Sequence, residues 1–184
     1  MKNIDNSSGK NMKIIIYSLL PIIFMLHEFE EIIFFKWWLN RDKEYMYNNF
    51  PKIGSKIYSQ YSKFSTAGFV LAIAEEFILI SLLTYIAIIT QSIYLWFAVF
   101  MGFSIHIVIH IIQFILYRKY IPVIFTSILV LPYCVYGFLL YINNEVYEIK
   151  WILICSIIGI ISVMLNLKLI HHLGAKFSNW EIKN

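Results

Sequence analysis

The chain has 184 residues, of which 60% are hydrophobic and 14% charged, and its mean hydropathy is +0.70. Soluble domains are roughly half apolar and a quarter charged, so this composition excludes both a soluble globular domain and a disordered chain. A net charge of +4, spread thinly over apolar sequence, also excludes the dense basic face of a nucleic-acid-binding module. The composition predicts a single helical membrane domain over residues 1–184, with no nucleic acid among its partners.

Five apolar runs are long enough to cross a bilayer. A hydrocarbon core about 30 Å thick requires roughly 20 predominantly apolar residues per helix. Runs of this kind extend over residues 14–38, 67–90, 93–117, 121–142 and 149–170. The predicted fold is therefore all-α: a polytopic transmembrane helical bundle of about five spans.

An amphipathic helix is predicted between the first and second spans. Its apolar and polar positions alternate with helical spacing, which is typical of a helix that lies in the membrane interface. The apolar stripe consists of Ile53, Ile57, Tyr61 and Phe64, and the opposite face carries Lys52, Lys56, Ser59 and Lys63. Two interpretations remain open: a simple anchor at the membrane surface, or a lid that contacts lipid headgroups.

The distribution of positive charge predicts an orientation in the membrane. Across five spans, four of the 15 Lys and Arg residues fall on one side, namely Lys2, Lys10, Lys13 and Lys150. The others fall on the opposite side. Because Lys and Arg are enriched in cytoplasmic segments, we expect the N-terminus outside and the C-terminus in the cytoplasm.

Ionisable residues interrupt the first three spans at depths where each charge costs roughly 2.5 to 3.5 kcal/mol. They are His27, Glu28, Glu30 and Glu31 in the first span, Glu75 and Glu76 in the second, and His106 and His110 in the third. No Lys or Arg lies at a matching depth in any predicted span. The carboxyl groups must therefore be protonated, matched by imidazolium, or gathered around a bound cation.

Helical geometry indicates which groups of the first span can act together. At 100° per residue, His27, Glu30 and Glu31 fall within an arc of about 100°, since spacings of three and four share a face. Glu28 is expected to point elsewhere.

The second and third spans carry matching groups. In the third, His106 and His110 lie one turn apart on one strip, with the small residue Gly102 above them. Measured from the predicted cytoplasmic ends, Glu75, Glu76 and both histidines reach the same layer as the first-span motif, about 10 to 16 Å deep. We expect the three motifs to form one shared site.

These motifs resemble a family of bacterial integral membrane proteins of unknown function that is named for its HXXEE motif. The resemblance rests on His27-Glu28-Phe29-Glu30-Glu31, followed by Ala74-Glu75-Glu76 and by the pair His106 and His110, in the family's order. It implies a multi-pass protein of the bacterial cell membrane and points to an enzyme. It carries over His27, Glu30, Glu31, Glu75 and the two histidines as functional positions, and it supplies no substrate.

The residue chemistry favours a metal-dependent enzyme. Helical bundles build metal sites from carboxylates and histidines on facing helices, and an enzyme keeps further carboxylates for proton transfer. The expected metal ligands are His27, Glu31, Glu75 or Glu76, His106 and His110, and the expected catalytic residues are His27, Glu30 and Glu31. Without thiolate ligands, zinc, iron and manganese all fit. A site among apolar helices is reached from the bilayer, so the expected partners are membrane lipids and a lipophilic small-molecule substrate.

Three other interpretations remain open. A metal-free enzyme could use one protonated Glu as an acid and one His as a base. Chains of Glu and His at mid-membrane also mark proton and ion pathways. Finally, the same groups could simply hydrogen-bond the helices together. No glycine-rich phosphate-binding motif is present, so no soluble cofactor is predicted.

Overall fold

The computed structural model describes residues 2–143 and 148–183, and within these ranges all secondary structure is α-helical. Seven helices follow one another along the chain. They are α1 (Lys2–Arg41), α2 (Lys43–Asn49), α3 (Pro51–Tyr61), α4 (Thr66–Ile89), α5 (Ile93–Tyr117), α6 (Ile124–Ile142) and α7 (Ile149–Lys183). The prediction of an all-α bundle is confirmed.

Five of these helices are long and apolar enough to cross a membrane. The spans are Asn11–Arg41, Thr66–Ile89, Ile93–Tyr117, Ile124–Ile142 and Ile149–Ser178. The fourth begins at Ile124 rather than at the expected residue 121, because Pro122 disfavours helical backbone at the residue before it and Val123 has a φ of 142°, outside the helical region. The first and last are longer than expected. Hydropathy identifies only the apolar part of each helix, whereas the helical backbone continues through the charged residues beyond it. The chain is thus a multi-pass membrane protein.

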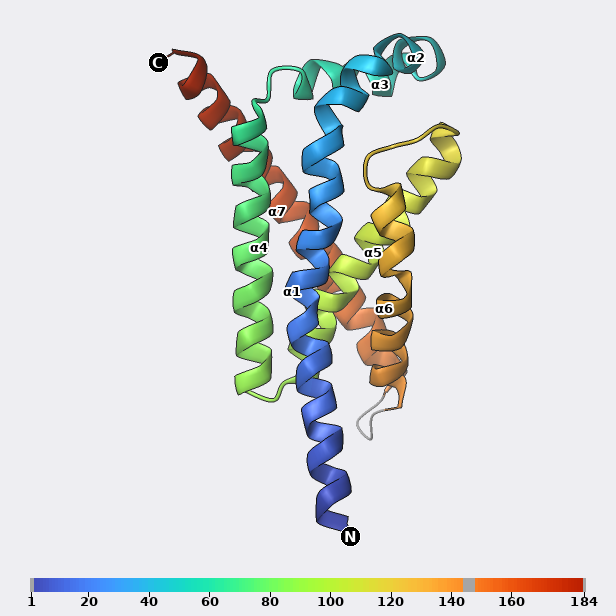
Figure 1. Cartoon of the computed structure of the whole chain (residues 1–184), viewed down its shortest axis with the longest axis vertical. Coiled ribbons are helices and arrows are strands. Elements are labelled where there is room, and N and C mark those ends of the chain that lie inside the picture. The colour runs from blue at the N-terminus through green and yellow to red at the C-terminus, as the bar shows by residue number, and fades with distance from the viewer. Residues whose placement is uncertain (1, 144–147, 184) are drawn as a thin grey trace.

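The spans surround a central first helix. In Figure 1, α1 lies between α4 and α6, while α5 and α7 cross behind it. The short helices α2 and α3 lie across the end of the bundle that also carries the C-terminus, and the N-terminus lies at the opposite end. Because α1 packs against α4, α5 and α6, side chains on several of its faces are buried.

Small residues bring α7 close to its neighbours at two heights. Gly159 meets α5 so closely that a Cβ there would lie 2.7 Å from the backbone nitrogen of Gly102 and 2.8 Å from the carbonyl oxygen of Ala98. Further along, Gly174 approaches α4, where its Cβ would lie 3.1 Å from the carbonyl oxygen of Gly68. Close contact between transmembrane helices at small residues is typical of membrane bundles. These contacts set the position of α7 against both partners.

The amphipathic helix predicted between the first two spans is confirmed as α3. It starts with Pro51 at its first turn, where a missing N–H costs no hydrogen bond. At its other end, the Lys36 ammonium of α1 donates to the carbonyl oxygens of Tyr61 (3.2 Å) and Ser62 (3.3 Å). The helix is thereby fastened over the end of the bundle.

A polar junction joins α1 to α2 and α5 at the same end. Asp42 accepts hydrogen bonds from the Arg41 guanidinium, with Nη2 to Oδ2 at 2.9 Å, and from the Tyr117 hydroxyl at 2.9 Å. Burial raises the pKa of Asp42, but these hydrogen bonds outweigh it and hold the pKa below the ordinary value of 3.8. The carboxylate therefore stays ionised near neutral pH.

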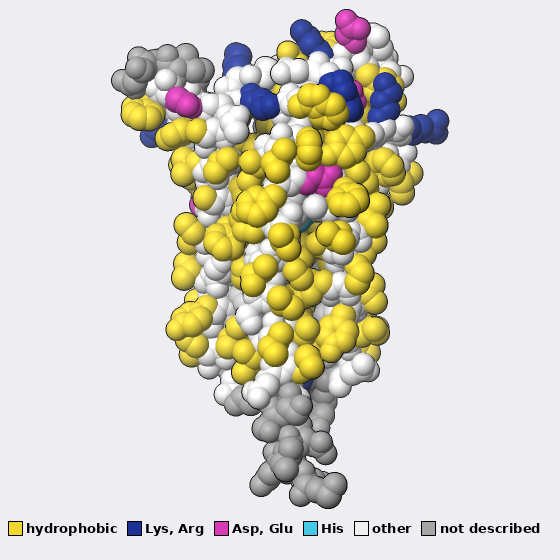
Figure 2. Space-filling model, viewed as in Figure 1, with side chains coloured by type: hydrophobic (Ala, Val, Ile, Leu, Met, Phe, Trp, Pro, Cys, Tyr) yellow, Lys and Arg dark blue, Asp and Glu magenta, His cyan; other side chains and the backbone are white. Residues whose placement is uncertain are grey.

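The outer surface matches a membrane environment. Figure 2 shows hydrophobic side chains over the middle of the molecule on the face drawn, with Lys and Arg gathered at the end formed by α2 and α3. Opposite that end, the core is filled by aromatic rings, including Trp96 stacked on Tyr17 at 4.2 Å between centroids. The polar residues of the first three spans lie above this aromatic core.

Candidate functional site

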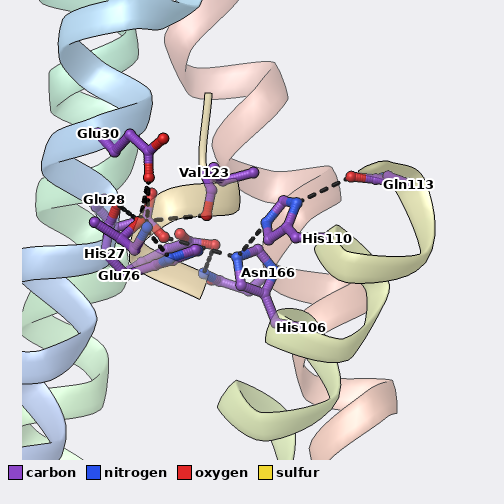
Figure 3. A network of polar contacts seen from close by, with 10 residues as sticks. His27, Glu28, Glu30, Glu76, His106, His110, Gln113, Val123 and Asn166 are labelled. Carbon is purple, nitrogen blue, oxygen red and sulfur yellow. Dashed lines mark hydrogen bonds and ion pairs between the residues drawn. The ribbon is translucent and has the colours of Figure 1, made fainter. Parts of the chain in front are cut away.

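Three histidines from two helices meet in the bundle. His27 of α1 approaches His106 and His110 of α5, with ring centroids 5.5 and 5.3 Å away respectively. One ring nitrogen from each of the three lies within 4.8 Å of the others. The Nε2 atoms of His106 and His110 are 2.9 Å apart (Figure 3). Two nitrogens bound to one zinc at 2.0–2.1 Å would lie about 3.3 Å apart, so a small movement would fit both to one metal ion.

Thr126 of α6 fixes the orientation of the His27 ring. Its Oγ1 lies 2.6 Å from Glu30 Oε2 and 3.1 Å from His27 Nδ1. The single hydroxyl proton goes to the charged acceptor at the shorter distance, so the hydroxyl oxygen accepts from His27 Nδ1–H. The Nε2 atom of His27 then holds a free lone pair. This atom is buried and has no hydrogen-bond partner among the described residues.

Gln113 orients the second imidazole in the same way. The His110 Nδ1 atom lies 2.9 Å from the Gln113 side-chain oxygen, to which it donates. Nε2 of His110 is then the acceptor, and His106 Nε2–H donates to it. Outer hydrogen bonds that fix a tautomer and aim the other nitrogen inward are a regular feature of metal-binding histidines. The His27 and His110 rings both have this arrangement.

Glu28 does not point away from these groups as expected; that prediction was wrong. Its side chain is buried, and Oε1 lies 3.7 Å from Nε2 of His106. The helical-face argument assumed that one narrow face of the first span is buried. Because α1 has neighbours on several sides, Glu28 is enclosed as well, next to Glu31 on the helix surface.

The Glu30 side chain accepts hydrogen bonds from the first turn of α6. Its Oε2 accepts from Thr126 N–H (2.7 Å) and from the Thr126 hydroxyl, and its Oε1 accepts from the Tyr120 hydroxyl (2.9 Å) and from Phe125 N–H (3.4 Å). Burial and this hydrogen bond raise the pKa of Tyr120, which stays a donor. A carboxylate facing the free N–H groups of a helix N-terminus is strongly favoured. The contacts of Glu30 are those of a group that positions Thr126 and His27.

The two acidic residues of α4, Glu75 and Glu76, face different cavities. Glu76 faces the same cavity as Glu28 and Glu31, and its Oε1 lies 3.4 Å from Nδ2 of Asn166. Glu75 instead lines a second cavity of about 650 Å³ between α4 and α7, together with apolar side chains and Lys176. The structure therefore brings Glu76, and not Glu75, beside the histidines (Figure 3).

A cavity of about 620 Å³ joins His106 and His110 to the end of the bundle, while His27 is buried behind them and does not line it. Its polar lining is formed by Glu28, Glu31, Glu76, His106, His110 and Gln113. The apolar stripe of α3, including Ile57 and Tyr61, covers the far end. Burial raises the pKa of Tyr61 to about 12, and nearby Glu31 adds to the effect, so this hydroxyl remains protonated. Pockets of 300–1,000 Å³ with a few converging polar groups are typical of small-molecule sites.

Sequence reasoning missed Thr126 and Tyr120, which hold Glu30 in place. One signal was available: a Thr at the start of an apolar span has its hydroxyl close to backbone N–H groups that need partners. Two amide side chains also contribute: Asn166 of α7 hydrogen-bonds across to Glu76 of α4, whereas Gln113 bonds to His110 within its own helix.

Fold and site together define a multi-pass membrane protein with histidines and carboxylates converging inside the bundle. The family model described as protein of unknown function with HXXEE motif matches residues 18–137. This range contains the motif of α1, the acidic pair of α4 and both histidines of α5. The chain belongs to this HXXEE family, as its motifs indicated. No curated protein and no solved structure matches it.

Proposed function

We propose that this protein is a metal-dependent membrane enzyme that acts on a lipophilic substrate. The observation that supports the proposal is the convergence of His27, His106 and His110, with outer hydrogen bonds from Thr126 and Gln113 that leave acceptor nitrogens facing inward. Neutral imidazole suits zinc, iron and manganese alike, and no cysteine is found among the described residues that line the cavity. A bound divalent cation would supply Lewis-acid or redox chemistry.

The carboxylates beside the histidines support an enzyme rather than a structural metal site. Three imidazoles and one carboxylate complete a closed shell, yet Glu28, Glu31 and Glu76 all line the cavity. We assign Glu31 as the general base, because it faces the cavity, and Glu30 as the positioning residue for His27. In this assignment Glu75 is not a ligand.

Elemental analysis of protein purified in mild detergent without chelator tests the proposal. We expect a stoichiometric divalent metal in the wild type and its loss in the double variant His106→Ala/His110→Ala. The matched control is His172→Ala, because His172 is exposed near the end of α7. Folded wild-type protein that holds no metal and takes up none on reconstitution would overturn the metal assignment and favour metal-free acid/base catalysis or proton handling.

We also propose that the end bearing α2 and α3 faces the cytoplasm of a bacterial cell. The Lys and Arg residues on this end support the orientation. A cysteine introduced at exposed Ser59 should be protected from an impermeant thiol reagent in intact cells and react after lysis. Labelling in intact cells would reverse the orientation.

A further inference from the structure

The helices α5 and α7 touch at one height and separate above it. Their contact is closest at Gly102 and Gly159, where backbone meets backbone. From there, Figure 1 shows α7 running toward α4 while α5 runs toward α6. Gly174 and Ser178 then place the far end of α7 against α4. On the side of the bundle that carries α3, the cavity extends between the two helices, where it is lined by Ile105 and Ile109 of α5 and by Val163 and Met164 of α7. We call this part of the cavity the wedge.

The cavity reaches the apolar outer surface through this wedge. Ile109 of α5 and Met164 of α7 both line the cavity, yet 46% and 66% of their surfaces are exposed. Their sequence neighbours Val108 and Leu165 are equally exposed, at 48% and 65%, but do not line it. Side chains that face both the cavity and the exterior mark an opening at the level of the membrane. Such an opening would let a molecule dissolved in the bilayer reach His106 and His110 without crossing water.

The charge of the lining restricts what can bind. Glu28, Glu31 and Glu76 line the cavity, and no Lys or Arg is found among its described lining residues. Lys52 and Lys56 of α3 are exposed on the opposite face of that helix. When ionised, these three carboxylates outweigh the two positive charges of one divalent cation at the histidines, so a phosphate, sulfate or carboxylate headgroup would meet a net negative site with no basic side chain to neutralise it. Uncharged or cationic polar groups meet no such barrier.

We propose that the substrate is a long-chain molecule with an uncharged or cationic polar end, which enters from the bilayer between α5 and α7. Its chain lies against Ile109 and Met164, and its polar end reaches His106 and the carboxylates. This inference rests on the proposed function and names the substrate class of the same site. It excludes, as substrates, the anionic phospholipids and fatty acids that an intramembrane site would otherwise meet.

Photolabelling in lipid nanodiscs tests the chemistry of the polar end. The probe is hexadecanol carrying a diazirine in its chain, and the competitors are hexadecylamine and hexadecyl sulfate at equal mole fraction. We expect labelled peptides from α5 and α7, and competition by hexadecyl sulfate at least about ten-fold weaker than by hexadecylamine. Equal competition by the two, or stronger competition by the sulfate, would overturn the charge argument.

Paired variants test the route. Met164→Trp fills the wedge, whereas Leu165→Trp adds the same bulk to a neighbouring exposed position outside the cavity. We expect labelling to fall about ten-fold in the first variant and to be unchanged in the second, with both folded. Equal labelling in both would refute the opening between α5 and α7. Metal content, measured on the same samples, reports separately on the proposed function, since labelling depends on the cavity and not on bound metal.

Discussion

Replacing Glu30 with Gln is expected to lower the free energy of unfolding, although the two side chains have nearly the same shape. Both carboxylate oxygens accept hydrogen bonds, Oε2 from Thr126 and Oε1 from Tyr120 and Phe125. Glutamine has one acceptor oxygen and one NH₂ group. Whichever way its amide turns, the NH₂ group faces a backbone N–H of the first turn of α6.

The magnitude follows from the donors left without an acceptor. Each buried donor that loses its partner costs about 1–3 kcal/mol, and the lost charge at a helix N-terminus adds up to about 2 kcal/mol. We expect a total loss of about 2–4 kcal/mol, because part of the network can turn toward the remaining oxygen. For a chain of this size, that corresponds to a fall in the apparent Tm of roughly 5–15 °C.

Thermal unfolding followed by circular dichroism in detergent measures this effect, with Glu31→Gln as the matched control. Glu31 lies on the same helix and lines the cavity beside two other acidic groups, so its neutralisation relieves repulsion. The control should unfold within about 2 °C of the wild type. A Glu30→Gln variant as stable as the wild type would refute the structural role. Glu30 would then again be a candidate catalytic residue.

Three further outcomes are expected. Glu28→Gln should lower bound metal about ten-fold, as measured by elemental analysis, because its carboxylate lies 3.7 Å from Nε2 of His106; metal content equal to the wild type would contradict the placement of this side chain at the site. Gly159→Ala should lower the free energy of unfolding by about 1–3 kcal/mol, and Gly102→Ala by less, since its Cβ would meet its nearest neighbour at 3.3 Å rather than 2.7 Å; equal denaturation curves would contradict the close crossing. The pKa of Asp42 lies below its ordinary value of 3.8, so its carboxylate stabilises the fold above that pH and loses this effect as the pH falls through the folded-state pKa. The difference in Tm between the wild type and Asp42→Asn should therefore shrink below about pH 4, and a pH-independent difference would count against the network.

The fold was predictable because hydropathy and helix length are tightly coupled in a bilayer. Backbone polar groups in lipid must bond within their own helix, so an apolar run of sufficient length has one available structure. The ends were less predictable. The first span continues to Arg41 and the last to Ser178, since Lys and Arg at a membrane boundary leave the helical backbone intact.

The composition of the site was predictable only in part, because periodicity gives directions relative to one helix axis and not the number of neighbours around it. Glu28 is enclosed because α1 is central. Glu75 and Glu76 are adjacent, so helical geometry separates their directions by about 100° but does not say which one faces the histidines. The crossing of α7 over α4 decides this, and that crossing depends on Gly68 and Gly174, far apart in the sequence.

The contacts explain why the HXXEE spacing suits a central helix. His27, Glu30 and Glu31 lie within four residue steps, just over one helical turn. They contact three different neighbours: the histidines of α5, the N-terminus of α6 and the cavity beside α4. Glu30 thereby aligns His27 through Thr126, so the motif supplies both a candidate ligand and the group that orients it. Glu28 occupies a position that the motif leaves open. Its carboxyl group lies 3.7 Å from Nε2 of His106 and so adds an acidic group to the site that the other three residues build.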